Sequence, residues 1–453
     1  MKPKANYVNK IMLAILAILF PLFANAEKVQ IGGIWYNLIE KAKQAVVAHE
    51  DDAYRDSIFV VPSTVTHNGE TYNVTEVERL YLTGSHSISI VLSEGIAQIG
   101  DEAFVGCRLK EITIPRSVVS IGKSAFSFCT ELTSISIPEG IQSINELTFC
   151  YSGLISITLP QSIKSIGKKA FYGCSHLQNI DIPDNVYLID EGAFEECSSL
   201  KNIYLSENLN GIWDSAFKGC ASLEEIKLPT KISSLRNSVF RGCSSLFSIE
   251  IPNNVSSIED FAFEGCINLK DIKIPQSTYS IGKYAFQGCI NLSSITIPAR
   301  VKHIEYHAFS ECANLDTLVI LGMSLIDDYA FSNCPQLLDV FCLSEKVFCA
   351  EDREFRGDYN IDALVAEEQT FFHSDIKYAT LHVPSDSERS YRNWSPWNKF
   401  GKIVPLTEED IEKIYGHPQK EFPYLVLPII LGFIFIVIFI AMKPKKKSST
   451  EGL

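Results

Sequence analysis

The pattern of hydrophobic and polar positions repeats every 22 or 23 residues through the middle of the chain. Each unit reads approximately Leu-x-x-Ile-x-Ile-Pro and then x-x-Val-x-x-Ile-Gly-x-x-Ala-Phe-x-x-Cys, as residues 269–289 illustrate. About eleven units keep this register, and each has a phenylalanine at the same place: Phe104, Phe126, Phe149, Phe171, Phe194, Phe217, Phe240, Phe263, Phe286, Phe309 and Phe331. A period of this length is typical of repeat solenoids, in which each unit is one coil of a stack.

The local pattern predicts how one coil is built. Ile272 and Ile274 alternate with polar residues and therefore face one side of a short strand, which the following proline ends. A second extended piece runs to Ile281, where Gly282 allows a tight corner. The segment around Phe286 suits a helical or 3-10 turn with the ring pointing inward. Because one coil cannot bury its apolar face alone, we expect stacked coils that share a continuous core.

These elements resemble the leucine-rich repeat of the BspA type over roughly residues 86–342. The resemblance implies a right-handed leucine-rich-repeat superhelix on exported proteins of host-associated microbes, with roles in adhesion and protein binding. Residues 379–405 are similar to the segment that often closes these solenoids, with Tyr391, Trp397 and Phe400 as its aromatic residues.

Three units depart from the pattern. Residues 211–213 and 234–236 replace the usual Ile-Gly corner with Gly-Ile-Trp and Ser-Leu-Arg. The unit of Phe149 is one residue short, and its Cys150 is out of register. We expect these units to bend or to pack more loosely.

Capping segments are predicted on both sides of the repeats, because the open ends of a repeat array need cover. Residues 27–85 read as a β-rich N-terminal cap, with a hairpin turn at His67-Asn68-Gly69. Residues 343–406 are expected to cap the other end, and residues 407–422 to form an acidic stalk.

The two termini carry export and membrane signals. Lysines in the first ten residues, apolar residues 11–23 and small residues 24–26 have the layout of a secretory signal peptide, so we expect residues 1–26 to be removed. Tyr424 to Met442 is an uncharged stretch long enough to cross a membrane as a helix, and four lysines follow it. Basic residues stay on the cytoplasmic side. The sequence therefore predicts a transmembrane helix at 423–442, a cytoplasmic tail at 443–453 and a single-pass protein whose bulk lies at the cell surface or in the periplasm.

Composition and motifs exclude several function classes. Forty Lys and Arg stand against 54 Asp and Glu, a net charge of −14, whereas nucleic-acid-binding proteins are usually basic. The sequence contains no G-x-S-x-G elbow, no phosphate-binding loop and no isolated cysteine with a plausible histidine partner. We therefore expect no nucleic-acid partner, no enzymatic activity and no cofactor.

Ten of the thirteen cysteines lie three residues after the repeat phenylalanine. Equivalent side chains in stacked coils project in parallel about 4.8 Å apart, whereas a disulfide needs them to turn toward each other. We expect a buried ladder of free thiols, with Cys174, Cys197, Cys220, Cys243, Cys266, Cys289 and Cys312 as its central members. Cys342 and Cys349 lie outside the ladder and could pair. No C-x-x-C cluster indicates a metal site.

His303, Glu305 and His307 invite comparison with a zinc protease. That chemistry needs H-E-x-x-H on a helix, so that both imidazoles share a face. Here Ile304 occupies the core isoleucine position of the repeat. We expect solvated histidines and no metal.

The residue between the two strand isoleucines faces outward and varies between coils. In the middle coils it is Asp181, Tyr204, Lys227, Glu250 and Lys273, whereas the end coils carry mostly small residues. A tyrosine among charges on a sheet face suits an interface, so these five are the candidate ligand-binding residues. The alternative is that exposed strand positions simply accept polar residues.

The leading hypothesis is a membrane-anchored extracytoplasmic protein whose solenoid surface mediates adhesion or binding to host matrix proteins, envelope proteins or a glycan. The alternative is a periplasm-facing structural scaffold of the cell envelope without an adhesive role.

Overall fold

The computed structural model describes residues 26–48, 58–80, 87–349 and 364–415 of the 453-residue chain. The chain divides into two compact units, Met1–Val404 and Pro405–Leu453. The first holds the stacked coils, and the second contributes the helix α3 (Glu408–Tyr415). The predicted transmembrane helix, the basic tail and nearly all of the predicted signal peptide lie outside the described residues. Among the residues that are described, no helix is long and apolar enough to cross a membrane.

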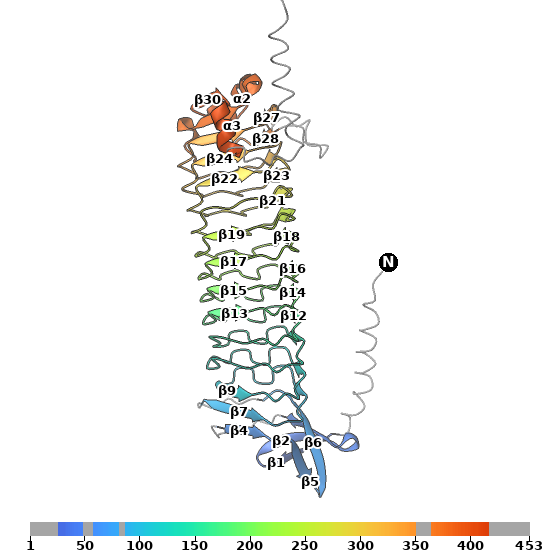
Figure 1. Ribbon diagram of the computed structural model, residues 1–453. Coiled ribbons are helices and arrows are strands. Elements are labelled where there is room, and N and C mark those ends of the chain that lie inside the picture. Colours follow the sequence, from blue (N-terminus) through green and yellow to red (C-terminus); the bar gives the residue numbers. More distant parts are fainter. Residues whose placement is uncertain (1–25, 49–57, 81–86, 350–363, 416–453) are drawn as a thin grey trace, which may run out of the picture. The chain divides into compact units, whose positions relative to one another are not determined.

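Most coils contribute two short strands, which form two ladders along the stack (Figure 1). The first ladder contains the strands before the repeat proline: β4 (Ile58–Val61), β7 (Ile88–Leu92), β9 (Leu109–Thr113), β13 (Asn179–Asp181), β15 (Asn202–Tyr204), β17 (Glu225–Lys227), β19 (Ser248–Glu250), β22 (Ser294–Ile297), β24 (Thr317–Ile320), β26 (Asp339–Cys342) and β29 (Thr380–Val383). The second ladder contains β6 (Glu70–Val77), β8 (Gln98–Ile99), β10 (Ser120–Ile121), β11 (Ser143–Ile144), β12 (Ser165–Ile166), β14 (Leu188–Ile189), β16 (Gly211–Ile212), β18 (Ser234–Leu235), β20 (Ser257–Ile258), β21 (Ser280–Ile281), β23 (His303–Ile304), β25 (Leu325–Ile326), β28 (Leu364–Ala366) and β27 (Val347–Cys349). Successive coils pair in parallel and in equivalent register, as Ile258 opposite Ile281 shows.

The third side of each coil is a run of β-turns, and the helical or 3-10 segment predicted around Phe286 is not present there. Tyr284 and Gly288, which flank Phe286, have left-handed backbone angles with φ of 58° and 68°. The same two positions are left-handed in other coils, among them Ser215 and Gly219, Phe261 and Gly265, and His307 and Glu311. A helix needs consecutive right-handed residues, so this alternation excludes it.

The core of the stack is a column of aromatic rings. Each repeat phenylalanine from Phe104 to Phe331 stacks on its neighbours, and Phe371 extends the column, with ring centroids 4.9 to 5.8 Å apart. The rings from Phe104 to Phe331 are fully buried. One inward ring per coil at a steady spacing requires a steady coil length, which the sequence repeat supplies.

The glycine after the second-ladder strands has a different role from the predicted tight corner. Gly122 and Gly282 have ordinary backbone angles, but each lies very close to the preceding coil. A Cβ on Gly282 would lie 2.7 Å from the backbone nitrogen of Asp260, and one on Gly122 would lie 2.5 Å from that of Asp101. Glycine therefore permits the close approach of successive coils.

The irregular units interrupt the second ladder. It is broken between β16 and β18, where residues 211–213 meet residues 234–236, and between β10 and β11, at the coil of Phe149. The coil of Phe149 nevertheless keeps its core, because the Phe149 ring is fully buried and stacks on Phe126 and Phe171. Ser152 replaces the ladder cysteine, with its Oγ 3.3 Å from Cys174 Sγ. Gly153 accommodates the missing residue, because a Cβ there would lie 2.1 Å from the Thr130 carbonyl oxygen. The departure at Phe149 is therefore confined to the strand pairing of β11 with the preceding coil, and the core of this coil is not loose.

At the N-terminal end, antiparallel strands extend the second ladder. β1 (Glu27–Ile31), β2 (Ile34–Ile39) and β3 (Gln44–Ala48) form a meander, with the 3-10 turn η1 (Glu40–Ala42) before β3, and β3 runs parallel to β6. β5 (Thr64–His67) pairs antiparallel with β6. The predicted hairpin turn is confirmed, with φ of 50° at Asn68 and 83° at Gly69, as a tight two-residue turn requires.

At the C-terminal end, the coils continue beyond residue 342, where the sequence predicts the repeats to stop. β28 pairs with β25 and β29 pairs with β26, so residues 364–384 form a further coil. The sequence of this coil does not match the repeat pattern well, because Thr370 replaces the repeat alanine and Ser374 replaces the repeat cysteine. The remaining elements are η3 (Ile376–Tyr378), η4 (Ser385–Ser387), α2 (Glu388–Asn393), η5 (Trp397–Lys399) and β30 (Lys402–Pro405).

Candidate functional site

All five candidate ligand-binding residues lie on the outward face of the first ladder. Asp181, Tyr204, Lys227 and Glu250 end the strands β13, β15, β17 and β19, and Lys273 holds the equivalent place in the next coil. Each is exposed while the isoleucine before it is buried, because successive side chains of a strand face opposite sides. The strand register sets Asp181 opposite Tyr204 and Lys227 opposite Glu250.

The first two of these residues, Asp181 and Tyr204, line a common hollow. It is lined by Ile157, Thr158, Leu159, Gln161, Asp181, Ile182, Pro183, Asp184 and Tyr204. The ring of Tyr204 is 60% exposed beside it. The sequence reasoning missed Gln161 and Asp184, because it considered only the position between the strand isoleucines. The residue after each repeat proline would have been the signal that finds them.

Lys227 does not line this hollow and forms an ion pair with Glu207. Its Nζ lies 2.8 Å from Glu207 Oε1. The hydrogen bond raises the pKa of Lys227 and lowers that of Glu207. Both side chains are largely exposed, so water and salt screen the pair. No lysine or arginine lines the hollow, which presents two carboxylates instead.

The cysteines predicted to form the core ladder are buried free thiols in the structure. From Cys129 to Cys334, each ladder thiol donates a hydrogen bond to the carbonyl oxygen of the phenylalanine in the preceding coil, at 3.0 to 3.3 Å. Burial raises the pKa of these thiols, to about 12 for Cys174. A thiol that stays protonated is a poor nucleophile and a poor metal ligand. Cys342 is likewise a free buried thiol, so the pairing with Cys349 that the sequence left open is not formed.

The sequence predicts a solvated His307, but in the structure this side chain is half-buried and stacked between two tyrosines. Its ring centroid lies 5.2 Å from that of Tyr284 and 5.0 Å from that of Tyr329. Phe261 continues the stack on the other face of Tyr284 at 5.0 Å. Burial lowers the pKa of His307. The signal in the sequence is an aromatic residue directly before the repeat alanine, two positions before the repeat phenylalanine. It recurs in four consecutive coils, at Phe261, Tyr284, His307 and Tyr329.

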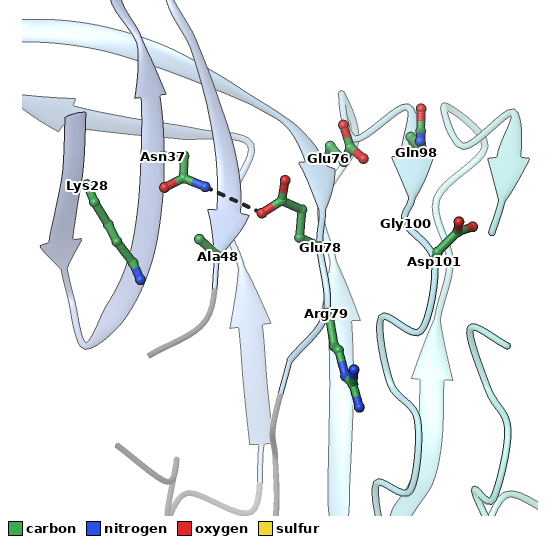
Figure 2. Close-up of a pocket in the computed structure, with 9 residues that line it drawn as sticks. All are labelled: Lys28, Asn37, Ala48, Glu76, Glu78, Arg79, Gln98, Gly100 and Asp101. Atoms are coloured by element: carbon green, nitrogen blue, oxygen red, sulfur yellow. Dashed lines mark hydrogen bonds between the residues drawn. The ribbon is translucent and has the colours of Figure 1, made fainter. Parts of the chain in front are cut away.

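Figure 2 shows a second hollow, beside β2, β3, β6 and β8, with Glu76 and Glu78 on its lining. Asn37 Nδ2 donates to Glu78 Oε2 at 3.3 Å. Burial raises the pKa of both carboxyls, and the charges of Glu78 and Asp101 raise that of Glu76 further. Within the described part of the chain, no group of three or more His, Cys, Asp or Glu side chains is arranged to hold a metal ion.

A family comparison decides what kind of solenoid these coils form. The model of the BspA type leucine rich repeat region matches residues 72–178, 122–247, 164–279 and 256–375, which together make up more than half of the chain. The chain belongs to the BspA type leucine-rich repeat family. The BspA type match also reaches past residue 342, in agreement with the additional coil at residues 364–384.

The chain is also similar to solved structures of other bacterial proteins. A leucine rich cell surface protein from Faecalibacterium prausnitzii is 27% identical, with 66% of this chain and 96% of that chain covered and a TM-score of 0.43. A leucine-rich repeat protein from Bacteroides ovatus is 22% identical, with 84% and 100% covered and a TM-score of 0.49. The pneumococcal vaccine antigen PcpA is 18% identical, with 84% of this chain and 99% of that chain covered and a TM-score of 0.48. The family assignment rests on the repeat model and not on these likenesses. No curated protein matches the sequence.

Proposed function

We propose that this BspA type protein is an exported, membrane-anchored recognition protein that binds a macromolecular partner through the outward face of the first ladder around Tyr204. The observation that carries the proposal is the exposed Tyr204 ring beside a hollow of polar side chains, on a face whose buried side is occupied by the shared core. Exposed tyrosines contribute much binding energy at interfaces, because they bury a large apolar ring and keep a polar tip.

The location of the protein is proposed from the termini. The signal-peptide pattern of residues 1–26 and the uncharged stretch Tyr424 to Met442, followed by lysines, support export with one membrane anchor and a cytoplasmic tail. We also propose that β1–β3 and the segment after β29 cap the two ends of a right-handed solenoid. This proposal is supported by the physical requirement that the terminal coils of a repeat array be covered.

The binding test uses the full-length protein in detergent micelles. Its binding to immobilised matrix proteins, envelope proteins and polysaccharides is compared with that of Tyr204→Ala and Lys227→Ala. Tyr187→Ala is the control, because Tyr187 is 48% exposed but lies next to the second ladder. We expect saturable binding that Tyr204→Ala weakens and Tyr187→Ala leaves unchanged. Equal binding by wild type and Tyr204→Ala contradicts the proposed face.

The second candidate function is a structural scaffold of the cell envelope. The proposed membrane anchor favours this function in a cell with two membranes. Digestion of intact cells with a protease distinguishes the scaffold from the surface recognition protein. Loss of the repeats to external protease supports surface display, whereas protection until the outer membrane is permeabilised, together with no bound ligand, supports the scaffold.

A further inference from the structure

We propose that the hollow beside Tyr204 binds an uncharged, hydroxyl-rich oligosaccharide. This inference rests on the proposed function, since it names the ligand of the same face. It is argued from three features of the hollow: a free aromatic ring, polar side chains without internal partners, and strands whose edges face the neighbouring coils.

The ring of Tyr204 differs from most aromatic rings of the coils. Phe128 stacks on Tyr151, and Tyr284 stacks on His307, so those rings cover one another's faces. Within the described residues, no ring contact joins Tyr204 to another aromatic side chain. A flat, exposed ring with a hydroxyl at its tip offers an apolar surface to the C–H face of a sugar ring and a polar group to its hydroxyls.

The polar side chains of the hollow are also available. Thr158, Gln161, Asp181 and Asp184 are exposed, and their side chains make no hydrogen bond to other described residues. Elsewhere polar side chains often pair between neighbouring coils, as Lys218 does with Glu195 at 2.8 Å. Carboxylates and amides accept several hydrogen bonds in a plane, and sugar hydroxyls are the donors that suit them.

The charge of the lining further restricts the class of ligand that the hollow can bind. Asp181 and Asp184 lie in the hollow without a lysine or arginine, and the nearby Lys227 is paired with Glu207. An anionic polysaccharide would be repelled by these carboxylates, because like charges across an interface are unfavourable. A neutral glycan meets no such penalty.

The strands themselves argue against an added peptide strand. β13 and β15 form a two-stranded sheet, in which the Ile182 N–H donates to the Tyr204 carbonyl at 2.9 Å. Neighbouring coils lie against both edges of this sheet, since Ser156 bridges to Asn179 on one side and β17 contacts β15 on the other. A peptide that binds as an extra strand needs an exposed sheet edge for its main-chain hydrogen bonds. Recognition here therefore depends on side chains alone, which is how a sugar would be bound.

The test measures binding of the full-length protein in detergent micelles to a panel of neutral and acidic oligosaccharides. We expect saturable binding to neutral members, weakened at least about tenfold by Tyr204→Ala and by Asp184→Ala, and largely retained by Tyr204→Phe. Tyr187→Ala is expected to bind as the wild type does. Circular dichroism confirms that each variant is folded. Absence of binding to every neutral glycan, or equal binding by Tyr204→Ala, overturns the inference.

A parallel experiment separates this inference from the proposed function. Partner surfaces are treated with glycosidases before the protein is added. Loss of Tyr204-dependent binding supports the glycan. Tyr204-dependent binding that survives the treatment overturns the glycan but leaves the proposed function standing, and salt-sensitive binding of a lysine-rich peptide instead would identify a cationic ligand. Binding that never depends on Tyr204 overturns both.

Discussion

The Cys197 thiol donates a hydrogen bond to the carbonyl oxygen of Phe171, one coil earlier, at 3.1 Å. The same oxygen accepts the N–H of Cys174 from its own coil, also at 3.1 Å. The repeat cysteine therefore links coils through its S–H as well as filling the core. Where serine stands in its place, at Ser374, the hydroxyl makes the equivalent bond to Phe331 at 2.7 Å. A small side chain with a donor suits this position.

Cys220 tests that requirement. Its thiol donates to the Phe194 carbonyl at 3.2 Å in a fully buried site. We expect Cys220→Ser to lower the free energy of unfolding by about 1 kcal/mol or less, because the donor is kept. Cys220→Val loses the donor and adds volume, so about 1 to 3 kcal/mol is expected. Chemical denaturation followed by fluorescence measures both, and a valine variant as stable as the serine variant would show that only apolar filling matters.

Thiol reactivity should distinguish Cys150 from the ladder. Burial raises the pKa of Cys150 to about 11 and that of Cys174 to about 12, and it raises those of Cys197 and Cys220 well above the ordinary value. Only the thiolate reacts, so we expect Cys150 to be alkylated before Cys174, Cys197 and Cys220 as pH rises. Mass spectrometry of iodoacetamide-treated native protein between pH 7 and about 10 locates the adducts. Earlier modification of Cys197 or Cys220 would be inconsistent with their burial.

The aromatic column should dominate stability in the middle coils. Phe217 is fully buried and stacks at 5.6 and 5.7 Å on its two neighbours. We expect Phe217→Ala to cost about 3 to 5 kcal/mol, because it removes a buried ring and leaves a cavity. Phe128→Ala is the control, since Phe128 also stacks on an aromatic ring but is 51% exposed, and about 1 kcal/mol or less is expected. Similar melting temperatures for the two variants would contradict this assignment.

Glu76 should make stability depend on pH. Burial and neighbouring carboxylates raise its folded pKa above 4.5, so ionisation opposes folding and stability falls as pH rises from 4.5 through the folded pKa. Glu76→Gln removes this term, so we expect a higher melting temperature than wild type at pH 7. The difference should vanish below pH 4.5, where the wild-type carboxyl is neutral in both states. Glu139→Gln, at an exposed position, serves as the control and should change the melting temperature at neither pH.

Much of the fold is predictable from the sequence, because a coil is a local pattern. The alternation of apolar and polar residues before the repeat proline gives a strand with one buried side at Ile295 and Ile297 in β22, whereas Ile272 and Ile274 are buried without forming a strand. The recurring phenylalanine gives an inward ring in each of these coils. The hairpin turn is also local, because Asn68 and Gly69 both tolerate the left-handed backbone angles that it requires. The turn side was predicted incorrectly, because the left-handed angle at Tyr284 is not one that a tyrosine favours by itself.

The sequence by itself determined the period, the inward residues and the family of this protein, because each depends on residues within one unit. Only the tertiary structure decided the contacts between units. The approach of Gly282 to Asp260, the thiol bond from Cys197 to Phe171 and the meeting of Gln161 with Tyr204 join residues more than 20 positions apart. Their distances are set by the register in which coils stack, and no single unit of the sequence contains that register.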